Sequence, residues 1–256
     1  MSTKSQSEHR RWRDRLPGRK PEPYFRWRGH GVSRLENLAD GVFAFSVTLL
    51  VVAQQVPNSF SGLMHALKSF PAFAASFAIL MFFWNVHYKF FRRYGLEDFF
   101  TRSVNYIVLL LVLFSVYPLK FLFNAAFQAG ARLDSIDQLY QVYQFYGCGI
   151  ALIWALFGML YGHAYRLRVA LNLSPIEIIL TRLELCGILI QVSTCLVSIM
   201  LAQLRVTPWL PGAIYASLGF TMWANGAWHG RQVGRELERQ RTPRGRNAPF
   251  NPPSPA

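Results

Sequence analysis

Six long apolar segments recur along this chain, and they restrict its possible folds more than any other feature. Each has roughly 20 residues, which in a helix matches the thickness of the hydrocarbon core of a bilayer. The six segments are residues 38–56, 70–87, 104–123, 143–165, 178–202 and 209–228. They predict an all-α, polytopic membrane protein with six transmembrane helices.

Polar ends flank this apolar region, which explains why a chain that is 52% hydrophobic has a mean hydropathy of only +0.18. Residues 1–30 are basic and lack the apolar core, about 7 to 15 residues long, that a cleavable signal peptide needs. We expect residues 1–30 to be a disordered cytoplasmic tail and residues 31–232 to be the six-helix domain. Residues 233–256, whose end is rich in Pro, Asn and Ser, are expected to form a second disordered cytoplasmic tail.

The distribution of basic residues predicts the orientation of the chain. With six spans, both ends lie on the same side, and only four of the 27 Lys and Arg residues fall on the other side: Lys68, Lys120, Arg132 and Arg205. The positive-inside rule therefore places both termini in the cytoplasm. The net charge of +14 then describes a basic cytoplasmic face that attracts anionic lipid headgroups. We expect no nucleic acid partner, because the chain has no recognisable nucleic-acid-binding fold or aromatic platform.

The three cysteines, Cys148, Cys186 and Cys195, form no CxxC pair, so neither a disulfide nor a zinc site is expected. Few potential disulfides and an unprocessed basic N-terminus fit a bacterial inner membrane, although an organelle membrane stays open.

No combination of nucleophile, base and metal ligands indicates an enzyme or a bound cofactor. His87, His163 and His229 fall at predicted cytoplasmic helix ends, but no helix carries two histidines at ligand spacing. A metal or haem site between helices is therefore only a minor alternative.

Charged residues lead into the first apolar segment at Arg34, Glu36 and Asp40. A charge at the edge of a transmembrane helix is costly unless it is paired, faces water or reaches the interface, so these residues are functional candidates. Glu36 alone fits an interfacial anchor. In the fifth segment, Arg182 and Glu184 point to different faces, and we expect Glu184 to make a structural hydrogen bond to another helix.

One stripe of the first helix has a pattern of its own. Phe45, Thr48 and Val52 follow at positions i, i+3 and i+7, so a hydroxyl lies between two apolar side chains. Such a stripe is commonly core packing. Repeated around a symmetry axis, it would instead form an apolar constriction and a ring of hydroxyl oxygens.

Two blocks of residues are similar to a known family. The first contains Arg34, Asp40, the run Gly41-Val42-Phe43-Ala44 and the run Thr48-Leu49-Leu50, with Leu38-Ala39 where the family has Phe-Ser. The second contains Trp84-Asn85-Val86-His87, Asn105 and Pro118. Together, across residues 34–123, they resemble the transmembrane protein 175 family of potassium-permeable channels.

This resemblance implies a homotetramer in which the first helix of each subunit lines the pore. It places the apolar constriction at Phe45, a layer of hydroxyl groups at Thr48 and a further ring at Val52. It also implies a channel without a carbonyl selectivity filter, and the chain has no TVGYG-like loop. The family usually has Ile or Leu at the constriction, so the bulkier Phe45 predicts a restricted pore.

The resemblance further implies a polar network that holds the pore helix against the second and third helices. Its members are Arg34, Asp40, Trp84, His87 and Asn105. A carboxylate accepts hydrogen bonds from Arg, His or indole donors, so these residue types suit one another. We expect them to support assembly and pore orientation and not to contact the ion.

The leading hypothesis is a passive, potassium-preferring cation channel that needs no cofactor and has potassium ions and membrane lipids as its partners. One alternative is a secondary transporter coupled to protons through Asp40, His87 or Glu184. The lack of an inverted repeat or paired broken helices weighs against it. A second alternative is a non-conducting membrane scaffold whose basic tails recruit lipids or proteins.

Overall fold

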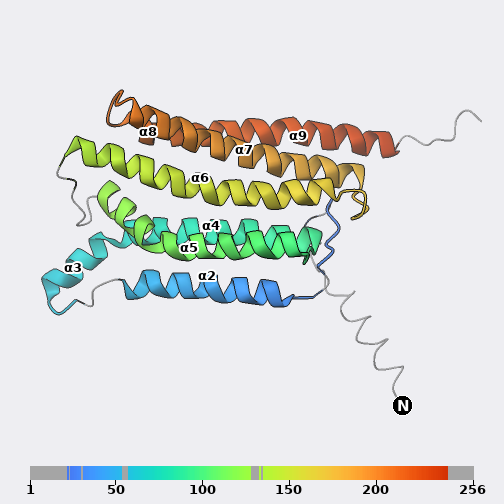
Figure 1. Ribbon diagram of the computed structural model, residues 1–256. Coiled ribbons are helices and arrows are strands. Elements are labelled where there is room, and N and C mark those ends of the chain that lie inside the picture. Colours follow the sequence, from blue (N-terminus) through green and yellow to red (C-terminus); the bar gives the residue numbers. More distant parts are fainter. Residues whose placement is uncertain are drawn as a thin grey trace, which may run out of the picture.

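The computed structural model describes residues 22–241 except 23, 30, 54–56, 128–132 and 134, and this part is helical with no β-strand. Its long helices lie side by side in layers (Figure 1). In chain order the elements are α2 (Arg34–Val52), α3 (Phe60–Lys68), α4 (Phe70–Tyr94), α5 (Phe99–Ala126), α6 (Ile136–Arg166), α7 (Pro175–Gln203), α8 (Leu210–Ala213), the 3-10 turn η1 (Ile214–Ala216) and α9 (Ser217–Arg241). The predicted all-α membrane architecture is confirmed.

Local capping explains where α2 begins. The Ser33 hydroxyl accepts a hydrogen bond from the Glu36 backbone N–H at 3.1 Å, and the Glu36 carboxylate accepts one from the Ser33 N–H at 3.4 Å. This reciprocal capping box starts the helix at Arg34, four residues before the predicted apolar segment. Glu36, which we expected to be an interfacial anchor, is only 7% exposed and caps the helix. The predicted end at residue 56 lies outside the described residues.

The second long helix, α4, is longer than predicted because it continues past His87 to Tyr94. Gly95 ends it in the left-handed conformation, with φ of 59°, which glycine adopts without strain. Arg92 and Arg93 occupy the last turn, where cations are favoured by the helix dipole.

The helix layers share a core that is rich in aromatic side chains. α2 packs against α4 and α5, α6 packs against α5 and α7, and α7 packs against α9. Phe83 of α4 contacts Trp154 and Phe157 of α6, with ring centroids 5.7 and 6.4 Å apart. Aromatic pairs of this kind contribute about 0.5–1.5 kcal/mol beyond burial. The pore-helix candidate α2 lies at an edge of the bundle, packed against α4 and α5 (Figure 1).

Five described helices, namely α2, α4, α5, α6 and α7, are long and apolar enough to cross a membrane. The predicted sixth span, residues 209–228, is helical but interrupted, because it comprises α8, η1 and the first half of α9. Pro211 lies near the start, and polar residues follow from Asn225 to the end of α9. Length and composition therefore do not confirm six spans.

Three further features differ from the prediction. The short helix α3 was not predicted, although Phe60, Leu63 and Leu67 already show the i, i+3, i+7 spacing of an amphipathic helix. Residues 24–29, expected in a disordered tail, lie against the helix ends, and Phe25 is only 5% exposed. Residues 233–241 continue α9 and are not disordered. The rest of both predicted tails lies outside the described residues.

Candidate functional site

The predicted stripe of α2 faces away from the core of its own subunit. Phe45 and Val52 are 54% and 71% exposed, and Thr48 is exposed as well. On the opposite face, Phe43 and Leu50 are almost fully buried. The helical period thus divides α2 into a packing face and an apolar free face with one hydroxyl group.

The hydroxyl group of Thr48 is held by its own helix. It donates a hydrogen bond to the Ala44 carbonyl oxygen four residues earlier, at 2.9 Å. A hydroxyl group has one hydrogen and two acceptor lone pairs, so this bond uses its only hydrogen. The Thr48 oxygen therefore keeps electron pairs that can accept a hydrogen bond or coordinate a cation.

A tryptophan of α4 supports the N-terminal half of α2 at Asp40. The Trp84 indole N–H donates to the Asp40 carboxylate at 2.9 Å. The indole ring also stacks on Tyr88, with ring centroids 5.4 Å apart, which orients the donor. This contact joins two residues of the predicted polar network.

His87 and Asn105 form a second pair, buried directly behind α2. Their Nε2 and Oδ1 atoms are 2.7 Å apart, and the two residues are 2% and 0% exposed. The His87 ring also contacts Phe43 of α2, with ring centroids 5.8 Å apart. The buried Nδ2 of Asn105 has no hydrogen-bond partner within the described part of the chain.

Arg34 does not join these pairs. Its side chain is exposed and has no hydrogen bond or ion pair with the described residues. The nearby ion pair is instead formed by Arg92 and Glu36, 3.6 Å apart. The five residues expected in one network therefore comprise two pairs and one separate arginine.

This arrangement predicts different results for two single variants. Trp84→Phe removes the donor to Asp40 and leaves that carboxylate without its indole partner, so we expect a loss of stability of about 1–2 kcal/mol. Arg34→Ala is the control, because the Arg34 side chain makes no hydrogen bond or ion pair with the described residues. Thermal unfolding of the detergent-purified protein measures both. Equal midpoints for the two variants would show that the Trp84–Asp40 bond has no stabilising role.

The remaining charged candidates have structural partners. Glu184 accepts a hydrogen bond from Arg93 of α4 at 2.9 Å, which fits its predicted role. His163 lies 3.2 Å from Asp98, the N-cap of α5. Partial burial opposes ionisation of Asp98, but hydrogen bonds from Thr101 together with His163 lower its pKa. Within the described residues, no group of His, Cys, Asp and Glu side chains could hold a metal ion.

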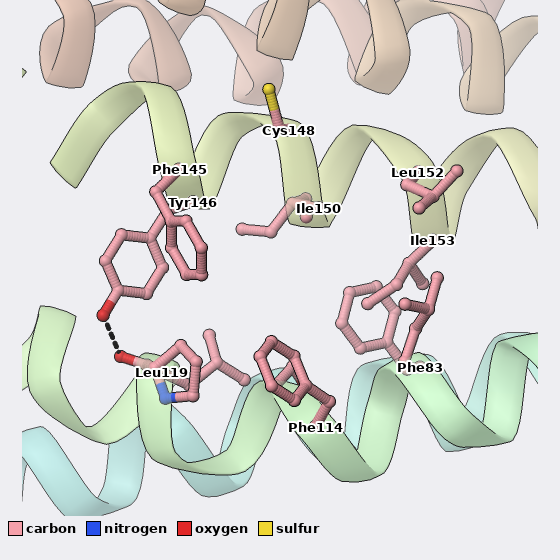
Figure 2. Close-up of a pocket in the computed structure, with 13 residues that line it drawn as sticks. Phe83, Phe114, Leu119, Phe145, Tyr146, Cys148, Ile150, Leu152 and Ile153 are labelled. Atoms are coloured by element: carbon pink, nitrogen blue, oxygen red, sulfur yellow. Dashed lines mark hydrogen bonds between the residues drawn. The ribbon is translucent and has the colours of Figure 1, made fainter. Parts of the chain in front are cut away.

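An apolar pocket of about 230 Å³ lies between α5 and α6 (Figure 2), and none of its lining residues belongs to α2. Phe114 and Leu119 of α5 face Phe145 and Ile153 of α6 across it. The Tyr146 hydroxyl group donates to the Pro118 carbonyl at one end of the pocket. The pocket has too few polar groups to guide an ion, so it is not part of the candidate conduction surface.

The sequence reasoning missed one polar centre, at Glu177 of α7. Its carboxylate bonds both to Arg28, which lies before α2, and to the N-cap residue Ser174. The spacing Ser174-x-x-Glu177 is a capping-box signal that can be read from the sequence. The contact with Arg28 joins residues 149 positions apart, and no local pattern indicates it.

Together these features define an all-helical integral membrane protein in which the face of α2 that carries Phe45, Thr48 and Val52 is left unpacked by its own subunit. The family described as the endosomal/lysosomal potassium channel TMEM175 matches residues 34–118. A protein of Marivirga tractuosa named potassium channel is 31% identical over 200 residues, which cover 73% of this chain and 80% of that protein. The chain therefore belongs to the TMEM175 family, and the predicted resemblance is confirmed. This family is one of channels and not of enzymes.

Other relatives and solved structures agree. A potassium channel of Chamaesiphon minutus is 32% identical over 108 residues, which are 39% of this chain and 53% of that protein. The crystal structure of a variant of the potassium channel MtTMEM175 superposes with a TM-score of 0.71 at 29% identity, covering 82% of this chain and 98% of that chain. A TMEM175 homologue from Chamaesiphon minutus, at 24% identity and a TM-score of 0.54, shows the same fold over 75% of this chain and 96% of that chain.

Proposed function

We propose that this chain forms a passive, potassium-preferring cation channel, a homotetramer in which α2 of each subunit lines the pore. The observation that carries the proposal is the free face of α2. Phe45, Thr48 and Val52 share one stripe, all are exposed in the subunit, and α2 lies at the edge of the bundle. Four such stripes around an axis would enclose a narrow path lined by apolar groups and hydroxyl oxygens.

Thr48 supplies the ion-coordinating layer in this proposal. Because its hydrogen is donated to the Ala44 carbonyl, its oxygen can present lone pairs toward the axis. Oxygen ligands replace part of the hydration shell of a cation, and four of them would form one coordinating ring. Phe45, one turn closer to the cytoplasm, would form the apolar constriction, and Val52 a further ring toward the outside.

The two polar pairs support the pore helix in this proposal. The Trp84–Asp40 bond holds the cytoplasmic half of α2 to α4, and the His87–Asn105 pair holds α4 to α5 behind it.

The relatives that are named potassium channels support potassium as the permeating ion. We further propose that both termini are cytoplasmic in a bacterial inner membrane and that the basic face contacts anionic lipids.

Potassium flux from liposomes containing the purified protein tests the proposed function, and reversal potentials in planar bilayers measure selectivity. We expect either that wild type conducts potassium, or that wild type is closed by Phe45 and the variant with a truncated Phe45 conducts. Thr48→Val should lower the preference for potassium over sodium about fivefold, equivalent to about 1 kcal/mol for one lost polar interaction. Assembly should not change, because Thr48 does not pack in the core.

Ser46→Ala is the matched control for this experiment. Ser46 also donates to a backbone carbonyl four residues earlier, that of Val42 at 2.8 Å, but it is fully buried on the packing face. Its removal should leave selectivity unchanged. If Thr48→Val and Ser46→Ala keep the same potassium preference, the hydroxyl layer is not formed by Thr48. If no variant conducts, the chain is not a passive channel.

A further inference from the structure

Residues 22–29, which we call the strap, run across one end of the helix bundle just before α2 (Figure 1). Residue 23 lies outside the described chain. The strap has no regular secondary structure, yet its Phe25 is buried against Tyr94, with ring centroids 5.6 Å apart. A segment without regular secondary structure needs partners for its polar groups, and the strap obtains them from α4, from α7 and from the loop between α6 and α7.

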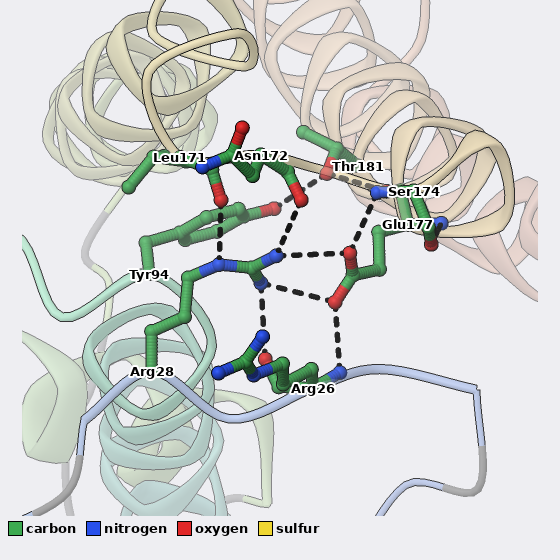
Figure 3. Close-up of polar contacts among 8 residues, drawn as sticks. All are labelled: Arg26, Arg28, Tyr94, Leu171, Asn172, Ser174, Glu177 and Thr181. Atoms are coloured by element: carbon green, nitrogen blue, oxygen red, sulfur yellow. Dashed lines mark hydrogen bonds and ion pairs between the residues drawn. The ribbon is translucent and has the colours of Figure 1, made fainter.

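The first attachment is to Glu177 in the first turn of α7 (Figure 3). Arg28 donates from Nη1 and Nη2 to the two carboxylate oxygens, each at 3.0 Å, in a bidentate pair. The backbone N–H groups of Arg26 and Ser174 donate to the same carboxylate at 2.8 Å each. Glu177 is 3% exposed and accepts four hydrogen bonds, a geometry in which charge-assisted bonds are strong.

The same arginine also reaches the loop between α6 and α7. Its Nε donates to the Leu171 carbonyl at 2.9 Å, and its Nη2 donates to the Asn172 carbonyl at 3.2 Å. Asn172 itself has a positive φ of 49°, so the loop turns tightly where Arg28 enters (Figure 3). Arg28 is therefore bonded to α7 and to the loop that precedes it.

The second and third attachments are to the end of α4. Arg93 makes two hydrogen bonds with Glu22 of the strap, at 2.8 and 3.0 Å. The backbone N–H groups of Arg28 and Gly29 both donate to the Arg92 carbonyl, at 3.1 and 3.3 Å. A Cβ atom on Gly29 would lie 3.0 Å from the Phe91 carbonyl oxygen, so the close approach of the strap to α4 favours glycine.

The strap leads almost directly into the pore-helix candidate. Gly29 is bonded to α4, and Ser33 is the N-cap of α2. Four residues span at most about 14 Å, so a displacement of the strap is transmitted to the first turn of α2. α7 lies on the far side of the α4–α5 layer from α2 (Figure 1). The strap therefore links α7 to α2.

We infer that Glu177 is a positioning residue for the pore helix, and that it acts through Arg28 and the strap to hold the cytoplasmic end of α2. This inference rests on the proposed function, because it assigns α2 to the pore. Glu177 does not contact the ion. The strap restrains the end of α2 that precedes Phe45. An outward movement of the Phe45 rings for conduction would have to displace this end of the helix.

The test compares Arg28→Ala with Arg26→Ala in the full-length protein in lipid nanodiscs. Both variants remove one arginine from the strap, but the Arg26 side chain is exposed and its described hydrogen bonds use only its backbone. Backbone amide exchange in residues 37–44 should accelerate about tenfold in Arg28→Ala, since losing charge-assisted bonds lowers the local opening free energy. Exchange in α5 and α6 should not change, and Arg26→Ala should match wild type.

Arg28→Lys is the second variant, for the case in which Arg28→Ala does not fold, because it keeps the charge but loses the bidentate geometry. Exchange of the same backbone amides should be about threefold faster in this variant. Any of three results would overturn the inference. Exchange in residues 37–44 could stay unchanged in Arg28→Ala, it could accelerate equally in all helices, or Arg26→Ala could show the same effect. Liposome flux with Phe45→Ala is measured in parallel. Absence of that flux would reject the pore assignment, whereas the exchange result alone decides the role of the strap.

Discussion

Phe45→Ala should raise the potassium flux about tenfold over wild type, because in the proposed tetrameric pore the truncation of four phenyl rings lowers the apolar barrier to the ion by about 1.4 kcal/mol. Phenyl groups at a narrow constriction exclude water and oblige the ion to shed its hydration shell. Phe45 is 54% exposed in the subunit, so its truncation leaves no cavity in the core. The flux should increase without a loss of assembled protein, as measured by potassium efflux from liposomes and by size-exclusion chromatography.

Phe220→Ala is a matched control for this prediction. Phe220 is 70% exposed on α9, on the side of the bundle opposite α2 (Figure 1). Phe220→Ala removes the same side-chain atoms as Phe45→Ala, but in a region that lies away from the proposed pore. The potassium flux of this variant should therefore equal that of wild type. If Phe45→Ala conducts no better than Phe220→Ala, then Phe45 does not form the constriction.

Glu177→Ala is the substitution with the largest expected effect on stability. It removes the acceptor of four hydrogen bonds and leaves the Arg28 guanidinium, whose side chain is only 15% exposed, without its carboxylate. It also removes half of the capping box at the start of α7. Breaking a buried ion pair from one side costs about 3 kcal/mol or more. The unfolding midpoint of the purified protein should fall by several degrees.

Glu97→Ala provides the comparison for this loss. Glu97 is an exposed carboxylate in the loop between α4 and α5, and no described hydrogen bond or ion pair involves it. Its replacement changes the net charge by the same amount, so a general effect of charge would appear in both variants. A midpoint for Glu177→Ala within one degree or so of that for Glu97→Ala would show that the strap contributes little to stability.

The apolar segments predicted the long helices well, because hydropathy over about 20 residues is a strong signal. Their ends were predicted less well. Polar residues such as Glu36 and Arg93 looked like flanking sequence, yet they lie inside helices, where caps and ion pairs satisfy them. The sixth predicted span comprises α8, η1 and the first half of α9, because hydropathy does not reveal where a helix tightens into a 3-10 turn.

For the candidate site, motif spacing identified residues that pair, but not how they pair. Trp84 meets Asp40 and His87 meets Asn105, whereas Arg34 lies apart. Which donor reaches which acceptor depends on helix rotation and packing, which a single sequence does not specify. The strap was beyond sequence reasoning for a related reason. Its partners are about 70 to 150 positions away, and a basic segment rich in Arg looks like a solvated tail.

The division of α2 into two faces has a consequence for how pores of this kind can diversify. Ala39, Phe43, Ser46 and Leu50 are buried on the packing face, whereas Phe45, Thr48 and Val52 are exposed on the free face. In the proposed pore, selection for a folded subunit and selection for a permeating ion therefore act on different positions of the same 19-residue helix. In that arrangement, conductance and selectivity can change by single substitutions at the free face without compensating changes elsewhere in the bundle.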